Sequence, residues 1–391
     1  MNTINCDLLI IGGGAAGLTA AISASEHKDL KIVIAESNAR VGKKLAVTGN
    51  GRCNITNKNL HKDNYYGDKD FAFNIFDKFG YFETLKFFDK LGVIIKTEVN
   101  GKAYPYSLQA TSVVDALRFE CDRRNIKTIL NCTIDSIDKN EGYFTAKSKD
   151  YNIKAKSIIC AFGGKAGGSL YGTDGNSNKL ISKWHKLIEQ SPVIVQLKTD
   201  NTITKRLKGI KVNAKVTICN KKDFGEVLFC EYGLSGPPIL QLSRFAKEGD
   251  YVYLDIMPEF SIAEIINLLE KRKGLERSKE EFFTGLINKK VGLEIIKSYN
   301  GNLSSQALAE ALKNFKFKIT GTTGFKNAQA TSGGFCTSEF TLGLESTKVP
   351  RLFCCGELLN VDGDCGGYNL QWAFSSGFIA GKSAYKSIKG K

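Results

Sequence analysis

The sequence predicts an α/β fold in which a parallel sheet is interrupted by an inserted β module and a small helical subdomain. Three observations support this prediction. An apolar run enters a glycine-rich turn near the start of the chain, at DLLIIGGGAAGLTAA. Short β-branched runs separated by turn residues begin at about residue 191, and amphipathic helical segments follow from Ser261 to about Phe317. The apolar run RLFCC then resumes the first pattern, so we expect the main domain at 1–190 and 320–391, the β module at 191–260 and the helical subdomain at 261–319.

The first apolar run is typical of a parallel strand that leads into a dinucleotide-binding turn. Residues 8–11 are aliphatic without alternation, as in a strand that is buried on both faces. Gly12, Gly14 and Gly17 then have the G-x-G-x-x-G spacing. In that motif the first glycine permits the tight turn, the second lets the backbone approach a pyrophosphate, and the third lets the helix pack on the strand. The free N–H groups of the helix would then point at phosphate oxygens.

A second strand ends in an acidic residue at the distance that this motif requires. The run KIVIAE ends at Glu36, about 20 residues past the glycines, where a carboxylate can accept hydrogen bonds from ribose hydroxyls. Strand, glycines, helix, strand and acid therefore occur in the order of a dinucleotide site.

Composition restricts the class of protein. With 391 residues the chain exceeds the size of one hydrophobic core, so we expect two or three domains. No apolar run reaches the roughly 18 residues that span a bilayer, and the first strand begins too near Met1 to leave room for a signal peptide. We therefore expect a cytoplasmic protein without a membrane segment.

Cysteine and histidine usage favours neither disulfides nor a metal site. The 11 cysteines form no C-x-x-C pair, and there are only three histidines. The adjacent Cys354 and Cys355 lie in an apolar run, where we expect them to be buried as small hydrophobic residues.

The formal charge of +15 raises the question of a nucleic-acid partner. Only 10 of the 55 basic residues are arginine, which specific phosphate and base recognition favours. The lysines are spread along the chain, as on an ordinary solvated surface. We therefore expect no nucleic-acid partner, while a nucleic-acid-associated enzyme stays open as an alternative.

A long polar, glycine-rich segment, SNARVGKKLAVTGNGRCNITN, directly follows Glu36. Loops of this length in compact domains usually carry function. Its basic residues supply positive charge near the expected pyrophosphate, and its glycines allow the backbone to lie against a flat ligand. Arg52, Cys53 and Asn54, which follow the glycines, offer hydrogen-bond donors.

The combination of GGGAAG, Glu36 and VGKKLAVTGNGRCNITN resembles the BaiN-like flavoprotein family. Its members are NAD(P)/FAD-dependent oxidoreductases on an FAD-binding Rossmann-like fold of the glutathione-reductase type, described as dehydro bile acid reductases and aminoacetone oxidases. The likeness continues through GEVLFCEYGLSGPPILQLS, which resembles the family's inserted β-barrel-like domain, and through RLFCCGELLNVDGDCGGYNLQWAF. It implies noncovalent FAD held by Gly12, Gly14, Ala15, Ala16, Gly17, Glu36, Lys44, Thr48, Gly49, Gly51, Arg52, Cys53, Asn54, Ile134, Ala161, Gly163, Gly356, Glu357, Gly367, Tyr368, Asn369 and Leu370.

The resemblance also has departures. Residues 68–125 read as helical around a rigid loop, GKAYPYSLQA, in which Lys102 replaces the usual arginine. Asn360 stands where the family commonly has aspartate, and the segment around Asp174 and His185 matches only loosely, so we expect neither of the latter to be a site residue. Ser235 has no G-x-S-x-G context and is not expected to be a nucleophile.

The implied chemistry is hydride transfer through flavin N5, with the protein supplying orientation and electrostatics. A helix that begins near Tyr368 would stabilise negative charge on the reduced flavin. We expect Arg52, Asn54, Tyr104 and Asn369 to shape the substrate face, with no indispensable acid or base.

We expect a small organic substrate. With one G-x-G-x-x-G unit only, NADH or NADPH would have to reach the flavin pocket itself. An aminoacetone-type amine oxidase that uses oxygen stays open as an alternative, as does a non-catalytic flavoprotein.

Overall fold

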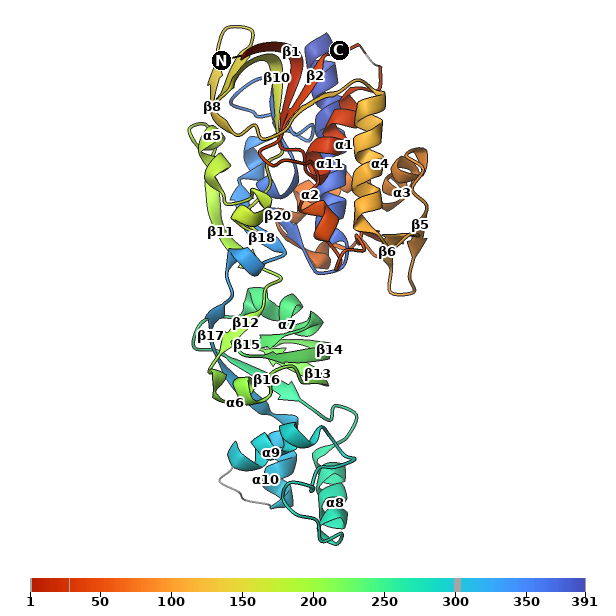
Figure 1. Ribbon diagram of the computed structural model, residues 1–391, viewed down its shortest axis with the longest axis vertical. Helices are drawn as coiled ribbons and strands as arrows, with labels where there is room; N and C mark the ends of the chain where they lie inside the picture. Colours follow the sequence, from red (N-terminus) through yellow and green to blue (C-terminus); the bar gives the residue numbers. More distant parts are fainter. Residues whose placement is uncertain (1, 28, 299–303, 391) are drawn as a thin grey trace. The chain divides into compact units, whose positions relative to one another are not determined.

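The computed structural model describes residues 2–27, 29–298 and 304–390, and the chain divides into two compact units (Figure 1). Unit 1 comprises Met1–Pro192 and Gln329–Lys391, and unit 2 is Val193–Ala328. Each unit has its own hydrophobic core.

The core of unit 1 is a seven-stranded sheet. Its strands are β1 (Asn2–Ile11), β2 (Ile32–Ala35), β7 (Lys127–Ile129), β8 (Ile134–Lys139), β9 (Phe144–Ser148), β10 (Tyr151–Cys160) and β19 (Leu352–Cys354). The order is β7-β2-β1-β10-β9-β8, and β19 pairs with β10 as well. β1 is parallel to β2 and β10, and residues 8–10 are fully buried, as expected for a central parallel strand.

Helices α1 (Ala15–Ala24), α4 (Ala110–Arg123) and α11 (Tyr368–Lys389) lie together beside this sheet (Figure 1). Glycines let α1 and α11 approach closely: a Cβ on Gly377 would lie 2.3 Å from the carbonyl oxygen of Ala16. A Cβ on Gly381 would lie 2.2 Å from that of Ala20. Any larger residue at either glycine would push the helices apart.

Short elements complete unit 1. They are the sheets β3-β6-β5 (Thr56–Asn57, Lys102–Pro105, Ile95–Thr97), β20-β4 (Val361–Gly363, Tyr65–Gly67) and β11-β18 (Leu187–Val193, Ala330–Phe335), with α2 (Lys69–Phe76), α3 (Tyr81–Lys90), α5 (Lys179–Ser182), η1 (Leu45–Val47), η2 (Lys62–Asn64), η3 (Ser169–Tyr171), η4 (Asn176–Asn178), η7 (Thr337–Glu339) and η8 (Gly356–Leu358).

The expected rigid loop GKAYP is instead partly a strand, because β6 pairs with both β3 and β5 and buries Ala103 and Tyr104.

Unit 2 contains a closed barrel of six strands, so the expected barrel-like module is confirmed. Around the barrel they are β12 (Leu197–Thr199), β15 (Gly233–Ser235), β14 (Lys221–Cys230), β13 (Lys211–Ile218), β16 (Tyr251–Asp255) and β17 (Phe315–Thr322). The prediction of helix up to Phe317 was wrong. In β17 the side chains of Phe315, Phe317 and Ile319 are buried and the intervening lysines are exposed, which is the alternation of a strand.

The helical elements of unit 2 are α6 (Asn201–Arg206), α7 (Pro237–Leu242), η5 (Ser243–Phe245), α8 (Ile262–Lys273), α9 (Lys289–Ser298), α10 (Ser305–Lys313) and η6 (Phe325–Asn327). The S-x-x-E spacing predicts capping boxes at Ser261 with Glu264 and at Ser278 with Glu281. α8 begins with the first of these. The second predicted helix start is wrong, because Ser278 precedes a run of turns that contains Glu281, and no helix begins there. Part of the predicted helical stretch, residues 299–303, lies outside the described residues.

Within the described residues, no helix combines the length and the apolar character needed to cross a membrane.

Candidate active site

The glycine turn between β1 and α1 is closely packed at two glycines and open at the third. Gly12 has φ +105°, and a Cβ there would lie 2.5 Å from the carbonyl oxygen of Ala161. A Cβ on Gly17 would lie 1.9 Å from the carbonyl oxygen of Gly12. A Cβ on Gly14 would meet no described atom within 4 Å. The open position is therefore the one that the motif assigns to the pyrophosphate.

The start of α1 can give its backbone N–H groups to an anion. Ala15 is the first helical residue, and its N-cap, Gly14, has no side chain to accept a hydrogen bond from the first turn. Free N–H groups at a helix N-terminus bind phosphate through hydrogen bonds and the helix dipole. Ala16, next along the helix, is buried and contributes packing.

The Glu36 carboxylate, at the end of β2, holds the turn from the other side. It is buried, its Oε2 accepts from the Gly13 N–H at 2.7 Å, and its Oε1 accepts from the Asn38 backbone and side chain at 2.8 and 2.7 Å. The Ser37 hydroxyl donates to Oε1 at 3.3 Å. Oε1 therefore accepts from three donors and Oε2 from one, so one acceptor position of Oε2 is left for a ribose hydroxyl.

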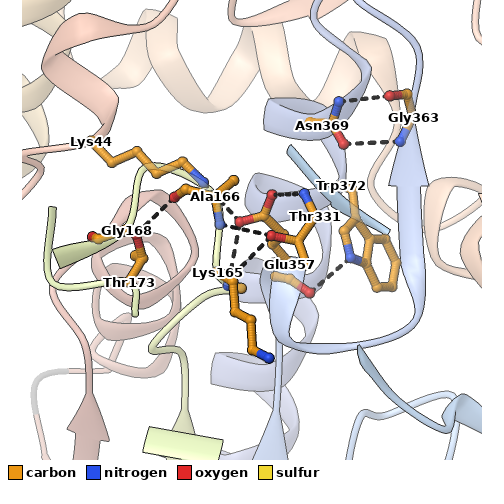
Figure 2. A network of polar contacts seen from close by, with 12 residues as sticks. Lys44, Lys165, Ala166, Gly168, Thr173, Thr331, Glu357, Gly363, Asn369 and Trp372 are labelled. Carbon is orange, nitrogen blue, oxygen red and sulfur yellow. Dashed lines mark hydrogen bonds and ion pairs between the residues drawn. The ribbon is translucent and has the colours of Figure 1, made fainter. Parts of the chain in front are cut away.

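A part-buried ion pair joins segments that are far apart in the sequence (Figure 2). Lys44 Nζ lies 2.8 Å from Glu357 Oε2, and the two side chains are 29% and 18% exposed. The other oxygen of Glu357 accepts from the Thr331 N–H at 2.8 Å, and Oε2 also accepts from the Gly164 N–H at 3.3 Å. One carboxylate therefore fixes the loops after β2 and β10 against β18.

The N-terminus of α11 is the second anchor of the site. Its N-cap Gly367 has φ +98° and no side-chain cap, and a Cβ there would lie 2.5 Å from the Thr56 carbonyl oxygen. The same Cβ would lie 2.9 Å from Asn54 Oδ1, which is buried and has no hydrogen-bond partner among the described residues. An unpartnered acceptor beside free helix N–H groups fits the edge of an isoalloxazine ring, which carries an N–H donor between carbonyl acceptors.

The residues that begin α11 serve chiefly to shape the turn before it. Asn369 Oδ1 accepts from the Gly363 N–H at 2.9 Å, and its Nδ2 donates to the Gly363 oxygen at 2.8 Å (Figure 2). Its amide thus bonds to the backbone instead of facing a substrate. Tyr368 is buried, with its hydroxyl donating to Asn59 O at 3.3 Å, and Leu370 packs against the core.

The TGNGRCN segment, residues 48–54, is a tight loop that directly follows η1. Thr48 Oγ1 donates to the Leu45 oxygen at 2.8 Å, and Gly49 has φ +58°. Cys53 is fully buried, and burial raises the pKa of its thiol to about 12, so it is not a nucleophile at neutral pH. A Cβ on Gly51 would meet no described atom within 4 Å, which leaves room for a ligand.

Arg52 and Tyr104 lie against each other at the edge of this loop. The guanidinium carbon of Arg52 is 5.0 Å from the centroid of the Tyr104 ring, in cation–π contact. Burial raises the pKa of Tyr104, although the Arg52 charge lowers it in part. The phenol therefore stays protonated at neutral pH and can donate a hydrogen bond.

Three further predicted positions lie around the sheet. Ile134 is buried at the start of β8, two residues after Cys132, whose N–H donates to the Glu36 oxygen at 2.8 Å. Gly163 follows β10 with φ +77°. Gly356 donates its N–H to Ser376 Oγ and accepts from Trp372 Nε1, both at 2.9 Å.

The predicted residues thus form two groups. Around the glycine turn lie Gly12, Gly14, Ala15, Ala16, Gly17, Glu36, Ala161 and Gly163, with Lys44, Gly356 and Glu357 beyond; around the start of α11 lie Asn54, Gly367, Tyr368, Asn369 and Leu370, next to the loop of Thr48, Gly49, Gly51, Arg52 and Cys53.

The sequence reasoning missed a buried polar network around Gln371. Its Nε2 donates to Ser375 Oγ at 2.7 Å and to Thr84 Oγ1 at 2.9 Å, and its Oε1 accepts from the Thr56 hydroxyl. The network ties β3 to the first turns of α11. The signal was the pair Gln371 and Ser375, polar residues one turn apart on an otherwise apolar helix face.

His185 and Asp174 lie outside both groups. His185 is buried, stacks on Phe340 at 4.5 Å between ring centroids, and places Nδ1 2.8 Å from Glu339 Oε2. Burial lowers the His185 pKa more than Glu339 raises it, so the ring is neutral at pH 7 and donates from Nδ1. Among the described residues, Asp174 accepts hydrogen bonds only from Asn176 of its own loop.

Cys354 and Cys355 are fully buried, as expected, and burial raises the pKa of both thiols. The cysteines of the described chain are all free. No group of three or more His, Cys, Asp or Glu residues in that part of the chain is arranged to hold a metal ion.

Known proteins resemble this chain over nearly its whole length. A family model described as HI0933-like protein Rossmann domain matches residues 6–383. A 3-dehydro-bile acid delta(4,6)-reductase of Clostridium scindens is 36% identical, over 96% of this chain and 98% of that protein. A ribosomal RNA dihydrouridine synthase of Escherichia coli is 26% identical, over 97% and 99% of the two chains. A 3-ketosteroid-Δ4-(5α)-dehydrogenase from Rhodococcus jostii RHA1 has a similar fold, with a TM-score of 0.53 and 14% identity over 98% of this chain and 97% of that one.

Proposed function

The chain belongs to the HI0933-like family and is a BaiN-like flavoprotein oxidoreductase, and on this premise we propose that it uses NAD(P)H to reduce a carbon–carbon double bond conjugated to a carbonyl group. The observation that carries the proposal is the similarity to the Clostridium scindens protein, whose name describes the reduction of double bonds in a 3-dehydro-bile acid. The substrate class is accordingly a small ring compound with an activated double bond.

The reaction balances with one hydride and one proton. The π bond of the substrate breaks, the carbon β to the carbonyl gains the hydride that NAD(P)H loses, and the α carbon gains a proton from solvent. FAD, when bound, supplies the hydride carrier between the two. Negative charge develops on the carbonyl oxygen of the substrate, so donors placed near that oxygen lower the barrier.

Unit 1 offers the groups to hold the cofactor. We assign the pyrophosphate to the open position at Gly14 and the uncapped start of α1, and the adenosine ribose to Glu36. Lys44 would add positive charge near the phosphates, while Glu357 would accept from hydroxyls of the ribityl chain. The flavin edge is assigned to Asn54 Oδ1 and the start of α11, on the basis of the unpartnered acceptor there.

Arg52 and Tyr104 are the donors that we assign to the substrate carbonyl. Arg52 is exposed and positively charged, and the Tyr104 phenol is protonated because burial raises its pKa. Both are hydrogen-bond donors that a carbonyl oxygen can accept from, and their contact with each other fixes their orientation.

Anaerobic stopped-flow mixing tests the proposal. The FAD-loaded protein is mixed with NADH or NADPH, and loss of the yellow flavin absorbance is followed before and after addition of a steroid 3-oxo-Δ4 compound. We expect bleaching faster than that of free FAD, and recovery of colour only when the enone is present. Bleaching at the rate of free FAD would reject the reductase proposal.

The same experiment separates the other two possibilities from the proposal. An amine oxidase of the aminoacetone type would be bleached by the amine without NAD(P)H and would recover its colour with oxygen. A non-catalytic flavoprotein would bind FAD and respond to none of these reagents.

The net charge of +15 favours a second candidate substrate, a uridine in RNA. The Escherichia coli relative is named a ribosomal RNA dihydrouridine synthase, and the uracil ring has the same arrangement of a double bond conjugated to a carbonyl. Mass spectrometry of nucleosides from RNA incubated with the enzyme and NAD(P)H tests this candidate, since each reduced uridine gains two hydrogen atoms.

A further inference from the structure

The outer surface of the unit 2 barrel gathers exposed aromatic and lysine side chains on four adjacent strands, β14, β13, β16 and β17. We call this set the barrel face. It consists of Lys215, Lys222, Phe224, Tyr251, Tyr253, Lys316 and Lys318. Phe224, Tyr251 and Tyr253 are 56%, 38% and 38% exposed, so three aromatic rings lie in solvent on one surface.

Strand register shows that these side chains are neighbours. Lys215 is directly opposite Phe224, Tyr253 is opposite Lys316, and Tyr251 is opposite Lys318. Directly opposed residues of antiparallel strands point to the same face of the sheet. The Tyr251 and Tyr253 ring centroids are 6.2 Å apart, and Lys316 Nζ lies 5.7 Å from the Tyr251 ring. The barrel face is therefore one continuous surface.

The charge of the barrel face is positive. Lys215 and Lys222 have no ion-pair partner within the ranges that the structure describes. The carboxylate opposite Lys215 is Asp255, and Lys313 Nζ holds it at 2.7 Å. Lys215 and Lys222 are thus free to meet an anionic partner.

Two rings in series beside unpaired lysines match the chemistry of single-stranded nucleic acid. Exposed aromatic rings stack on unpaired bases, while lysines act as point charges for phosphates, without need of the fork that arginine gives to base-specific contacts. A duplex backbone would use the lysines but would offer no unpaired base to the ring faces.

We propose that the barrel face binds single-stranded RNA, with bases stacked on Tyr251 and Tyr253 and phosphates at the flanking lysines. The site lies in unit 2, whereas the cofactor-binding residues lie in unit 1. The inference goes beyond the proposed reduction, because binding can be measured without turnover.

Fluorescence anisotropy with the full-length, FAD-loaded protein tests this proposal. The probe is a labelled single-stranded RNA of roughly 12 nucleotides, a length within the range that such surfaces occupy. At physiological salt we expect saturable binding, at least about tenfold weaker in a Tyr251→Ala/Tyr253→Ala variant, since stacking on one ring is worth roughly this factor or more. The Tyr251→Phe/Tyr253→Phe variant keeps the rings and should retain most of the affinity.

Lysine variants and a matched control sharpen the test. Lys215→Ala/Lys222→Ala should reduce the dependence of log Kd on log salt by about one to two units. Tyr143 of unit 1, 37% exposed with Lys154 Nζ 5.5 Å from its ring, is a similar tyrosine–lysine pair outside the face. Tyr143→Ala should leave RNA binding unchanged.

Several results would overturn the proposal. These are no binding by the wild-type protein, equal binding by the double alanine variant that keeps its flavin colour and Tm, equal affinity for duplex RNA or anionic vesicles, and an equal loss with Tyr143→Ala. A flavin site that fails the stopped-flow test would not affect any of them.

Discussion

Replacing Gly14 by alanine separates cofactor binding from folding. Gly14 has φ −83°, which alanine adopts without strain, and its Cβ would meet no described atom within 4 Å. The methyl group would instead occupy the space that we assign to the pyrophosphate. Loss of one charge-assisted hydrogen bond between that phosphate and the α1 backbone costs about 1.5–3 kcal/mol, which corresponds to a roughly 10- to 100-fold increase in Kd for FAD.

The assay is titration of the apoprotein with FAD by quenching of flavin fluorescence, together with thermal unfolding. For Gly14→Ala we expect the weaker Kd above and an apoprotein stability within about 1 kcal/mol of wild type. For Gly17→Ala we expect both binding and stability to fall, because its Cβ would lie 1.9 Å from the Gly12 oxygen.

Gly274→Ala is the matched control. This glycine ends α8 in unit 2 with φ −67°, and the nearest atom to its Cβ is 3.5 Å away. It should change neither quantity. If Gly14→Ala binds FAD as tightly as wild type, the turn does not hold the pyrophosphate and the assignment of the cofactor site is wrong.

Three further predictions concern stability. Gly377→Ala would place a methyl group 2.3 Å from the α1 backbone and should cost at least about 2 kcal/mol in urea unfolding; a smaller loss would mean that α1 and α11 can separate freely. Glu357→Gln, which breaks the part-buried pair with Lys44, should cost about 1–2 kcal/mol, and an unchanged midpoint would show that the pair adds nothing. Burial lowers the pKa of His185. Burial raises the pKa of Glu339, but its contacts with Lys348 and His185 outweigh this effect, so the pKa of Glu339 is also lower than usual. The unfolded state therefore binds more protons than the folded state, so the contribution of these groups to the free energy of unfolding is complete above about pH 6.5 and falls on acidification. In His185→Phe, the Tm should depend less on pH between about pH 5 and 6.5 than in the wild type.

Local patterns predicted much of unit 1. The family resemblance and the fold class are confirmed, and α11 begins at Tyr368 as expected from the glycine-rich run before it. These features depend on residues that are adjacent in the sequence: a buried strand, a turn that only glycine can make, and a helix that follows directly. The burial of Cys354 and Cys355 follows from the same local reasoning.

The features that sequence patterns did not predict depend on residues far apart in the chain. Nothing near Glu357 indicates that its carboxylate meets Lys44 and Thr331, because the partners come from separate loops. Asn369 was expected to face the substrate, but backbone groups of the preceding turn take up its amide. β17 was misread for another reason: its alternation is clear, but it directly follows the amphipathic helix α10.

The close contact between α1 and α11 has a consequence for biosynthesis. α1 ends at Ala24 and α11 begins at Tyr368, so all of unit 2 is translated after α1 and before the helix on which α1 packs. A nascent chain emerging from the ribosome must carry β1 and α1 with an apolar surface exposed until α11 arrives, a state that favours chaperone binding. Unit 2, whose strands all come from one continuous stretch, can fold while that surface waits.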